Sequence, residues 1–224
     1  MIRYYNFDQR SPKWHSYRKD KWTGSVAIKL LQGAKVPPES NPNYDNKYMQ
    51  RGRILEPLAA EAYEKKTGHK MSHFGFVTNS KYKHAGYSPD GIEEDTIDEI
   101  KCVNVEKHMA VGSGAMPIPV EWIAQMHFGL VITELHKLRL ILYNPDAEIP
   151  LFILPVVVRE ETLANIIARL IAVAPKGRPS AQRAKRKYVD DNPMKVRENR
   201  RRAYLKSKEH DTSRNATRAK RKSA

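Results

Sequence analysis

The stretch SPDGIEEDTIDEIK at residues 88–101 decides how this sequence is interpreted. It places an acidic residue on a turn and then continues into a strand. Strand side chains alternate between faces, so Glu99 and Lys101 project to one side while Ile100 points to the other. If the two halves of the stretch pair as neighbouring strands, Asp90 joins Glu99 and Lys101 at one point.

Two carboxylates and a lysine in this arrangement suit a hard divalent cation beside a phosphodiester. Mg²⁺ prefers oxygen ligands and keeps several waters, so Asp90, Glu99 and the carbonyl oxygen of Ile100 provide a suitable half-shell. Lys101 then orients the attacking water or stabilises the developing negative charge. Surface hairpins rich in Asp, Glu and Lys are common, so an exposed hairpin without chemistry is the alternative for this stretch alone.

The positive charge of the chain is concentrated at its C-terminal end. The formal net charge is +15 over 224 residues, which suggests a polyanionic partner. Residues 175–224 contain 18 of the 40 Lys and Arg but only 5 of the 25 Asp and Glu, so residues 1–174 are nearly neutral. A Pro- and Gly-containing break starts this tail, and its few apolar residues cannot bury enough surface to fold alone. We expect one ordinary folded domain over 1–174 and a basic tail that is disordered or becomes helical on DNA; a merely solvating tail is the alternative.

Cysteine content and hydropathy indicate a cytoplasmic protein. Cys102 is the single cysteine, which excludes an internal disulfide framework. No apolar run approaches the roughly 20 residues of a membrane-spanning helix, and the N-terminus lacks a signal-peptide core, so we expect no membrane partner.

Apolar periodicity predicts a mixed α/β fold. The predicted helices cover 26–31, 47–67, 119–134 and 160–174, and the predicted strands cover 69–78, 82–87, 96–103, 137–143 and 151–158. Ser25 is the expected N-cap of the first helix, Gly68 closes the second, and Pro57 kinks or restarts it. This order indicates a central mixed β-sheet flanked by helices, of α/β (α+β) class.

Five motifs in the same linear order carry a resemblance to a known family. Pro89-Asp90 with Glu99-Ile100-Lys101 resembles the PD-(D/E)xK nuclease signature. The others are WHSYR at 14–18 with Ser25, RGRILEP at 51–57, SPDG at 88–91 and EWIAQMH at 121–127. Over roughly residues 10–158 the chain resembles the phage lambda exonuclease and YqaJ-type viral recombinase nucleases, which implies a restriction-endonuclease-like core. Val103 departs from the family, where a proline often follows the catalytic lysine by two positions.

The resemblance implies a pocket for a 5′-terminal phosphate formed by Arg18, Ser25 and Ser88. A guanidinium binds phosphate through two N–H groups, and a helix N-terminus offers free N–H donors, which agrees with this role. An ordinary surface arginine and a simple helix cap are the alternatives for Arg18 and Ser25. We assign three further residues to DNA binding: Trp14, Arg51 and Arg53.

The resemblance also adds residues to the metal site. It implies that Glu56 reaches the metal directly or through water, with a solvent-facing glutamate as the alternative. Gln125 is expected to position the water or the scissile phosphate. Trp122 lies three residues earlier on the same helix face, where a position in the core or in the wall of the site is favoured over a DNA-stacking platform.

The expected function is a metal-dependent 5′-to-3′ exonuclease that resects linear double-stranded DNA, leaves 5′-phosphates and supplies a single-strand annealing protein. The cofactor would be one or two Mg²⁺ ions, or Mn²⁺, and the family implies a homo-oligomer of trimeric type in the cytoplasm of a bacterial host. Three alternatives stay open: a restriction-like or structure-selective endonuclease, a non-catalytic DNA-binding module, and an RNA-binding protein.

Overall fold

A four-stranded mixed sheet forms the centre of the molecule. The computed structural model describes residues 1–38 and 46–175, and Met1–Ala174 form one compact unit. The strands, in spatial order, are β3 (Gly91–Glu93), β4 (Thr96–Lys101), β5 (Lys137–Tyr143) and β6 (Leu151–Val156). β4 and β5 are parallel, whereas β3 and β6 pair antiparallel with their neighbours. The expected mixed sheet flanked by helices is therefore confirmed.

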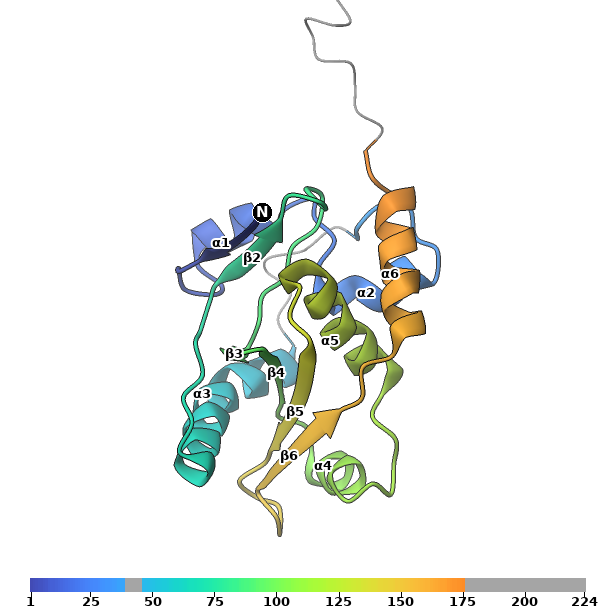
Figure 1. Cartoon of the computed structure of the whole chain (residues 1–224). Coiled ribbons are helices and arrows are strands. Elements are labelled where there is room, and N and C mark those ends of the chain that lie inside the picture. Colours follow the sequence, from blue (N-terminus) through green and yellow to red (C-terminus); the bar gives the residue numbers. More distant parts are fainter. Residues whose placement is uncertain (39–45, 176–224) are drawn as a thin grey trace, which may run out of the picture. The chain divides into compact units, whose positions relative to one another are not determined.

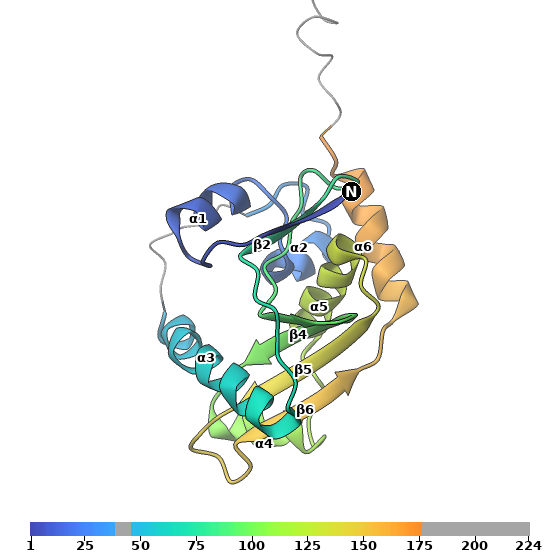
Figure 2. The same ribbon diagram turned by 60° about the vertical axis from the view of Figure 1, so that its left-hand side comes forward.

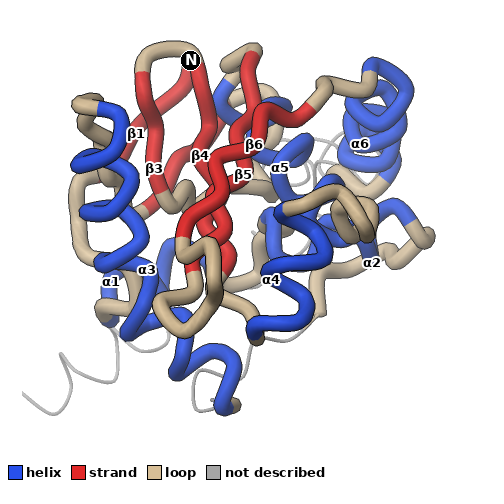
Figure 3. The backbone as a smooth tube through the Cα atoms, turned by 90° about the horizontal axis from the view of Figure 1, so that it is seen from below, coloured by secondary structure: helices blue, strands red, loops and turns tan. Residues whose placement is uncertain are grey.

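Strand β5 explains why helices cover both faces of the sheet. Leu138, Leu140 and Leu142 belong to a buried cluster on one face, and Ile141 belongs to a second cluster on the other. Figure 3 shows α5 (Val120–Thr133), α2 (Ala27–Leu31) and α6 (Glu160–Ala172) on one side of the sheet and α3 (Lys47–Thr67) on the other. Each face of the sheet thus contributes to a separate apolar core, as the alternation of strand side chains requires.

The parallel pair β4–β5 requires a long connection, because two parallel strands cannot be joined by a tight turn. Helices α4 (Val105–Gly112) and α5 supply it. Asn104 caps α4 by accepting from the backbone N–H of Lys107 at 3.3 Å. Helix α4 was not predicted, whereas α5 agrees with the prediction for 119–134 to within one residue at each end. Most side chains of α5 are buried.

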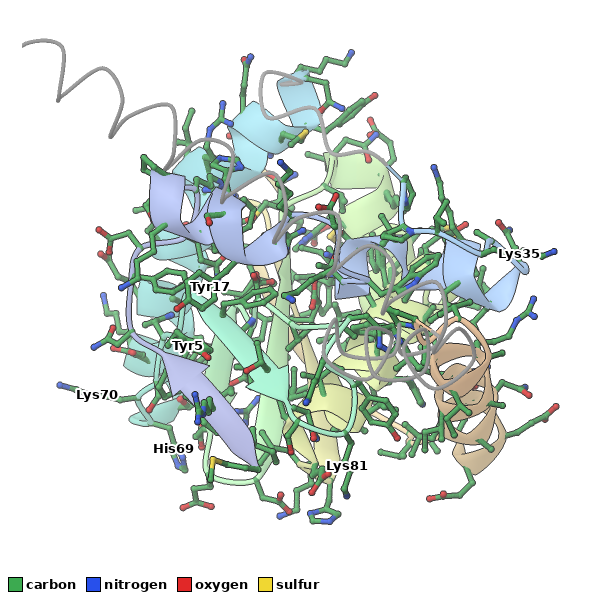
Figure 4. The ribbon with its side chains drawn as sticks, turned by 90° about the horizontal axis from the view of Figure 1, so that it is seen from above. Tyr5, Tyr17, Lys35, His69, Lys70 and Lys81 are labelled. Carbon is green, nitrogen blue, oxygen red and sulfur yellow. The ribbon has the colours of Figure 1, made fainter. Side chains whose placement is uncertain are left out.

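The N-terminal residues build a second, smaller sheet beside the first. Strand β1 (Ile2–Tyr5) pairs antiparallel with β2 (Phe76–Asn79), and helix α1 (Pro12–Arg18) follows (Figure 1). Ser11 caps α1 by accepting from Trp14 N at 3.2 Å, with proline at the first helical position. Tyr5 and Tyr17 pack edge to face at 4.7 Å between ring centroids, which anchors α1 on this sheet (Figure 4). As a result α1 and α3 lie on the same side of the molecule (Figure 2).

The local predictions for helix α3 were largely correct. It spans 47–67 as expected and ends at Gly68, whose φ of 77° is the left-handed conformation of a helix C-terminus. Pro57 neither ends nor restarts the helix, which runs through it as one element. Buried residues on the sheet-facing side, including Ala59, Ala60 and Tyr63, offset the lost backbone hydrogen bond.

Three other local predictions were wrong. Ser25 does not cap a helix: it lies inside the 3₁₀ turn η1 (Gly24–Val26), and α2 starts only at Ala27. Residues 82–87 form isolated bridges from Ala85 and Tyr87 rather than a strand. The strand predicted over 69–78 is shorter, because it starts at Phe76.

The predicted boundary after Ala174 falls at the end of the described residues, and the basic tail lies outside them, so the prediction for 175–224 stays a prediction. Within the described ranges, no helix is both long and apolar enough to cross a bilayer.

Candidate functional site

Asp90 lies in the turn directly before β3, the strand that pairs with β4. Gly91 stands opposite Asp98 in the antiparallel register, so the preceding residue, Asp90, reaches the level of Glu99. Its Oδ2 accepts from Ile100 N at 2.8 Å. Since the N–H and C=O of one strand residue point to the same side, the carbonyl of Ile100 also faces the edge that Asp90 occupies. The structure thus brings Asp90, Glu99 and Ile100 together.

Glu99 is fully buried and connects the strand to helix α5. Its Oε1 accepts from Lys101 Nζ at 2.5 Å, and its Oε2 accepts from the Tyr87 hydroxyl at 3.1 Å. Lys101 also donates to Gln125 Oε1 at 3.2 Å. Side-chain alternation is visible at the preceding residue, because Asp98 pairs at 2.6 Å with Arg139, whose guanidinium lies over the Tyr63 ring of α3. Lysine, glutamate and glutamine therefore form one connected group on the α5 side.

The charges at this site shift the pKa of two groups. Burial is the main cause that raises the pKa of Asp90 well above its ordinary value, and the negative charge of Glu99 adds to it. Burial by itself lowers the pKa of Lys101, but the charges of Glu99 and Asp90 outweigh it and raise the pKa. A bound cation would relieve the repulsion between the carboxylates of Asp90 and Glu99, which adds to the effect of burial. The donor set therefore fits a hard divalent ion.

Glu56 lies on α3 between two cavities. One, of about 530 Å³, is also lined by Asp90, and the other, of about 670 Å³, by Lys101 and Gln125; Ile100 borders both. A Cβ added at Gly52 would lie 2.9 Å from Glu56 Oε1, so the glycine leaves the room that this carboxylate occupies. Glu56 faces the site as expected, but its Oε2 accepts from Arg10 at 3.1 Å.

The carboxylates are not preassembled into a metal cage. Among the described residues no three His, Cys, Asp or Glu side chains are grouped closely enough to hold an ion. The hydrogen bonds explain this spacing. Protein donors engage Glu99 on both oxygens, Glu56 is paired with Arg10, and Asp90 accepts from a backbone N–H.

A second cluster lies two residues before Asp90, at Ser88. Arg18 donates to Ser88 Oγ and to Ser25 Oγ, both at 3.2 Å, and its guanidinium stacks over the Trp14 ring at 4.3 Å. Trp14 Nε1 donates to the same Ser88 oxygen at 2.9 Å. Thr23, which sequence reasoning missed, accepts from Arg18 at 3.4 Å. The structure thus brings Arg18, Ser25, Ser88 and Trp14 together.

The electrostatics of this cluster suit an anion. Arg18 is bound by neutral hydroxyls and an aromatic face, and burial lowers its pKa to about 10. The side chain therefore stays protonated at neutral pH in surroundings that do not cancel its charge. A phosphate group has the charge and the acceptor geometry that such a guanidinium binds.

The remaining predicted residues lie on helices around the site. Arg51 is not in the Ser88 cluster: its Nη2 lies 3.8 Å from Asp146 Oδ2. Arg53 lines the cavity that contains Asp90. Trp122 is half-buried in the wall of the other cavity, with Lys107 Nζ 4.7 Å above its ring.

Sequence reasoning missed three contributors to the site, two of which come from distant segments. Gln9 Nε2 donates to Pro89 O at 2.7 Å, and His73 Nδ1 lies 2.9 Å from Asp90 O. Tyr87 supports Glu99, and its position one residue before Ser88 was the only available signal. Gln9 and His73 stand in segments with no motif, so their contacts follow only from the fold.

The fold is shared with solved exonuclease structures. One is the structure of LHK-Exo, an alkaline exonuclease from Laribacter hongkongensis, in complex with dAMP. It is 23% identical to this chain with a TM-score of 0.63, and the alignment covers 83% of this chain and 100% of the LHK-Exo chain. A second structure of LHK-Exo is 22% identical, with a TM-score of 0.61 and the same coverage. A phage-related exonuclease from Haemophilus somnus is 13% identical, covers 71% of this chain and 94% of its own, and has a TM-score of 0.52. A search of curated proteins finds no match.

The sequence itself matches a family. The sequence model of the YqaJ-like viral recombinase domain matches residues 13–136. That range includes Arg18, Glu56, Asp90, Lys101 and Gln125, the residues around which the two clusters are built. Because the match covers more than half of the chain, this protein belongs to the YqaJ-like viral recombinase domain family.

Proposed function

We propose that this protein is a metal-dependent deoxyribonuclease that degrades linear double-stranded DNA from its 5′ ends. One observation carries the proposal. Ser88 belongs with Arg18 to the cluster that suits a phosphate group. Asp90, two residues later, belongs with Glu99 to the acidic site. A bound terminal phosphate and a site for phosphodiester hydrolysis are then connected through a single turn. The exonuclease names of the solved neighbours support the same reading.

The metal ligands would be Asp90, Glu99, Glu56 and the Ile100 carbonyl, and Mg²⁺ or Mn²⁺ suits these oxygen donors. When bound, the ion supplies a polarised water and neutralises charge on the phosphodiester. To bind the ion, Glu56 would release its ion-pair partner Arg10.

Lys101 and Gln125 orient the attacking water. They are hydrogen-bonded to each other at 3.2 Å, so their side chains present a fixed pair of polar groups to one point. Water attacks phosphorus in line with the bond to the 3′ oxygen, that bond breaks, and the 3′ oxygen takes a proton. The nucleotide released retains its 5′-phosphate. Lys101 compensates the negative charge that develops on the phosphate oxygens.

End recognition is assigned to the cluster around Arg18. Its guanidinium and the hydroxyls of Ser25 and Ser88 bind the terminal phosphate, and this contact sets the direction of digestion. From the family we further propose a homo-oligomer of trimeric type that acts in a bacterial cytoplasm and hands resected ends to an annealing protein. The basic residues after Ala174 increase affinity for the DNA backbone.

End-labelled linear duplexes test the proposal. Purified protein with Mg²⁺ is incubated with duplexes that carry a 5′-phosphate or a 5′-hydroxyl, with a closed circle and an Asp90→Asn control alongside. We expect progressive loss from phosphorylated 5′ ends, an intact circle and an inactive variant. Cleavage of the circle indicates an endonuclease, and absence of metal-dependent cleavage indicates a binding protein.

A further inference from the structure

The segment that precedes the family match forms one wall of the cavity at Asp90. The family match begins at residue 13, yet Asn6–Arg10 line the 530 Å³ cavity together with Glu56 and Asp90. Nothing in the shared motifs accounts for this wall. Any contact of its side chains with a molecule in the cavity would therefore lie outside the range of the family match.

The wall is held rigidly against the Asp90 turn. Gln9 Nε2 donates to Phe74 O at 3.2 Å and to Pro89 O at 2.7 Å. Gly75 N donates to Tyr5 O at 2.9 Å, and a Cβ at Gly75 would lie only 2.0 Å from the carbonyl oxygen of Phe7. Backbone packing this close leaves the segment no room to move inward. The backbone of Arg10 is therefore held in place beside the cavity.

Arg10 has an unusual backbone conformation. Its φ of 68° is left-handed, a region that a side chain disfavours and a glycine adopts freely. The conformation lets the chain turn before Ser11 caps α1, and it directs the guanidinium to Glu56. Strained conformations of this kind are concentrated at functional sites, and here one holds a cation at the rim of an acidic cavity.

The ion pair of Arg10 is exchangeable. The two side chains of the Arg10–Glu56 pair are 44% and 34% exposed, and pairs this exposed are weak. A DNA strand that enters the cavity meets the carboxylates of Glu56 and Asp90, which repel its phosphates. The guanidinium of Arg10 at the same point offsets this repulsion, and it can bind a phosphate through two N–H groups as it can a carboxylate.

We propose that Arg10 is a substrate-binding residue that pairs with Glu56 in the free protein and binds a phosphate of the DNA strand when the cavity is occupied. The inference rests on the proposed nuclease function, which supplies the DNA. Arg10 does not take part in bond breaking. Gln9 is a positioning residue, because it holds the turn of Asp90 and the backbone of Arg10 at a fixed separation.

The test compares Arg10→Gln with Arg3→Gln, which removes the same charge from an exposed position on β1. Affinity for a short 5′-phosphorylated duplex is measured in EDTA at several salt concentrations, so that neither cleavage nor metal contributes. Each phosphate contact makes the slope of log affinity against log salt more negative by about 0.9. We expect Arg10→Gln to make that slope about one unit less negative and to weaken binding about three- to tenfold, whereas Arg3→Gln leaves both unchanged.

A second variant separates binding from folding. Arg10→Gly relieves the left-handed strain, so its melting temperature should equal or exceed that of the wild type while its DNA binding falls as in Arg10→Gln. Arg10→Lys retains the charge and should recover part of the salt slope.

If the wild-type protein cleaves DNA, two results overturn the inference while the proposed function stands. One is equal DNA affinity of Arg10→Gln and Arg3→Gln, and the other is tighter DNA binding by Arg10→Gln. A wild-type protein that neither binds nor cleaves DNA overturns the proposed function as well.

Discussion

Trp14 and Arg18 share one acceptor: both donate to Ser88 Oγ, and the guanidinium lies 4.3 Å from the indole ring centroid. Because Ser88 Oγ accepts from both donors, its own O–H hydrogen points away from them. Under the proposed function, a bound phosphate would accept from this hydroxyl and from the Arg18 guanidinium. This geometry depends on the planar fork of arginine, which lysine lacks.

Arg18→Lys therefore tests end recognition. The substitution retains the charge but loses the stacking and the paired N–H groups, so we expect the preference for 5′-phosphorylated over 5′-hydroxylated ends to fall about tenfold, or about 1.4 kcal/mol. Initial rates on the two duplexes measure this preference. Arg3→Lys serves as the control, and an unchanged preference in Arg18→Lys would contradict the assignment.

Lys101→Met separates catalysis from stability. The substitution leaves Glu99 buried opposite an apolar side chain, so the free energy of unfolding should fall by about 3 kcal/mol, and hydrolysis should be lost. The double variant Lys101→Met/Glu99→Gln removes the unpaired charge. It should recover most of the stability in thermal unfolding and none of the activity. A double variant as unstable as the single one would show that the ion pair is not what stabilises the strand.

Asp90→Asn should stabilise the protein above the ordinary aspartate pKa and should abolish cleavage. The folded-state pKa of Asp90 is raised, so the folded protein binds a proton that the unfolded chain releases at lower pH. Wild-type stability consequently falls as pH rises from the ordinary aspartate value through the raised pKa. Asparagine still accepts from Ile100 N and does not ionise, so its unfolding free energy should stay flat over that window. Urea unfolding at a series of pH values checks this, and Mg²⁺ should restore wild-type stability only.

Gly52→Ala should have opposite effects on stability and activity. Alanine is favoured over glycine in a helix interior by about 1 kcal/mol, but its Cβ would meet Glu56 Oε1 at 2.9 Å. Glu56 must turn aside, so we expect a higher melting temperature and a lower apparent affinity for Mg²⁺. Titration of activity with Mg²⁺ measures the second effect. Gly52→Ala in a Glu56→Gln background should cause little further loss, and an equal loss there would contradict the explanation.

His127 makes the fold sensitive to acid. It is fully buried, its Nδ1 bonds Ile123 O at 2.8 Å, and its Nε2 accepts from Arg159 N at 2.9 Å, which joins α5 to the start of α6. Burial lowers its pKa, so the neutral ring contributes its full stability above the ordinary histidine value and loses it as pH falls through the lowered pKa.

His127→Gln should lower the free energy of unfolding at pH 8 by about 1.5 kcal/mol and flatten its decline in acid. The exposed His15, which packs against the Trp14 ring, provides the control, because His15→Gln removes no buried imidazole and should leave that decline intact. Denaturant unfolding between pH 4 and 8 distinguishes the two variants.

The sequence predicted the parts of the site that depend on short-range geometry. Glu99, Lys101 and Asp90 could be placed together because strand alternation and one turn determine their directions. Arg10 and Gln9 could not, because they reach the site only through the pairing of β1 with β2, and no local pattern encodes which strand β1 joins. Helix α1 was missed because seven residues show too little periodicity, although Ser11 and Pro12 carry the signals of a helix start.

The wrong prediction for 82–87 has a similar origin. Tyr87 and Ala85 look like strand residues because they are apolar and buried, but they form only isolated bridges to Val77 and Trp22. Apolar character reports burial, and burial alone does not tell a strand from a packed loop. Ser25 was assigned as a cap for a comparable reason: its type suits that role, but the preceding turn displaced the helix start to Ala27.

The turn Ser88-Pro89-Asp90 sets a distance. Two residues span at most about 7 Å of backbone. Under the proposed function, the serine that binds a chain end and the aspartate at the bond to be broken are therefore held at a separation that no domain motion can change. Pro89 restricts the backbone between them further, and Gln9 holds its carbonyl. Under the proposed function, the length of this turn determines how many nucleotides are removed per turnover. Inserting one residue between Ser88 and Asp90 should therefore change the length of the products and not only the rate.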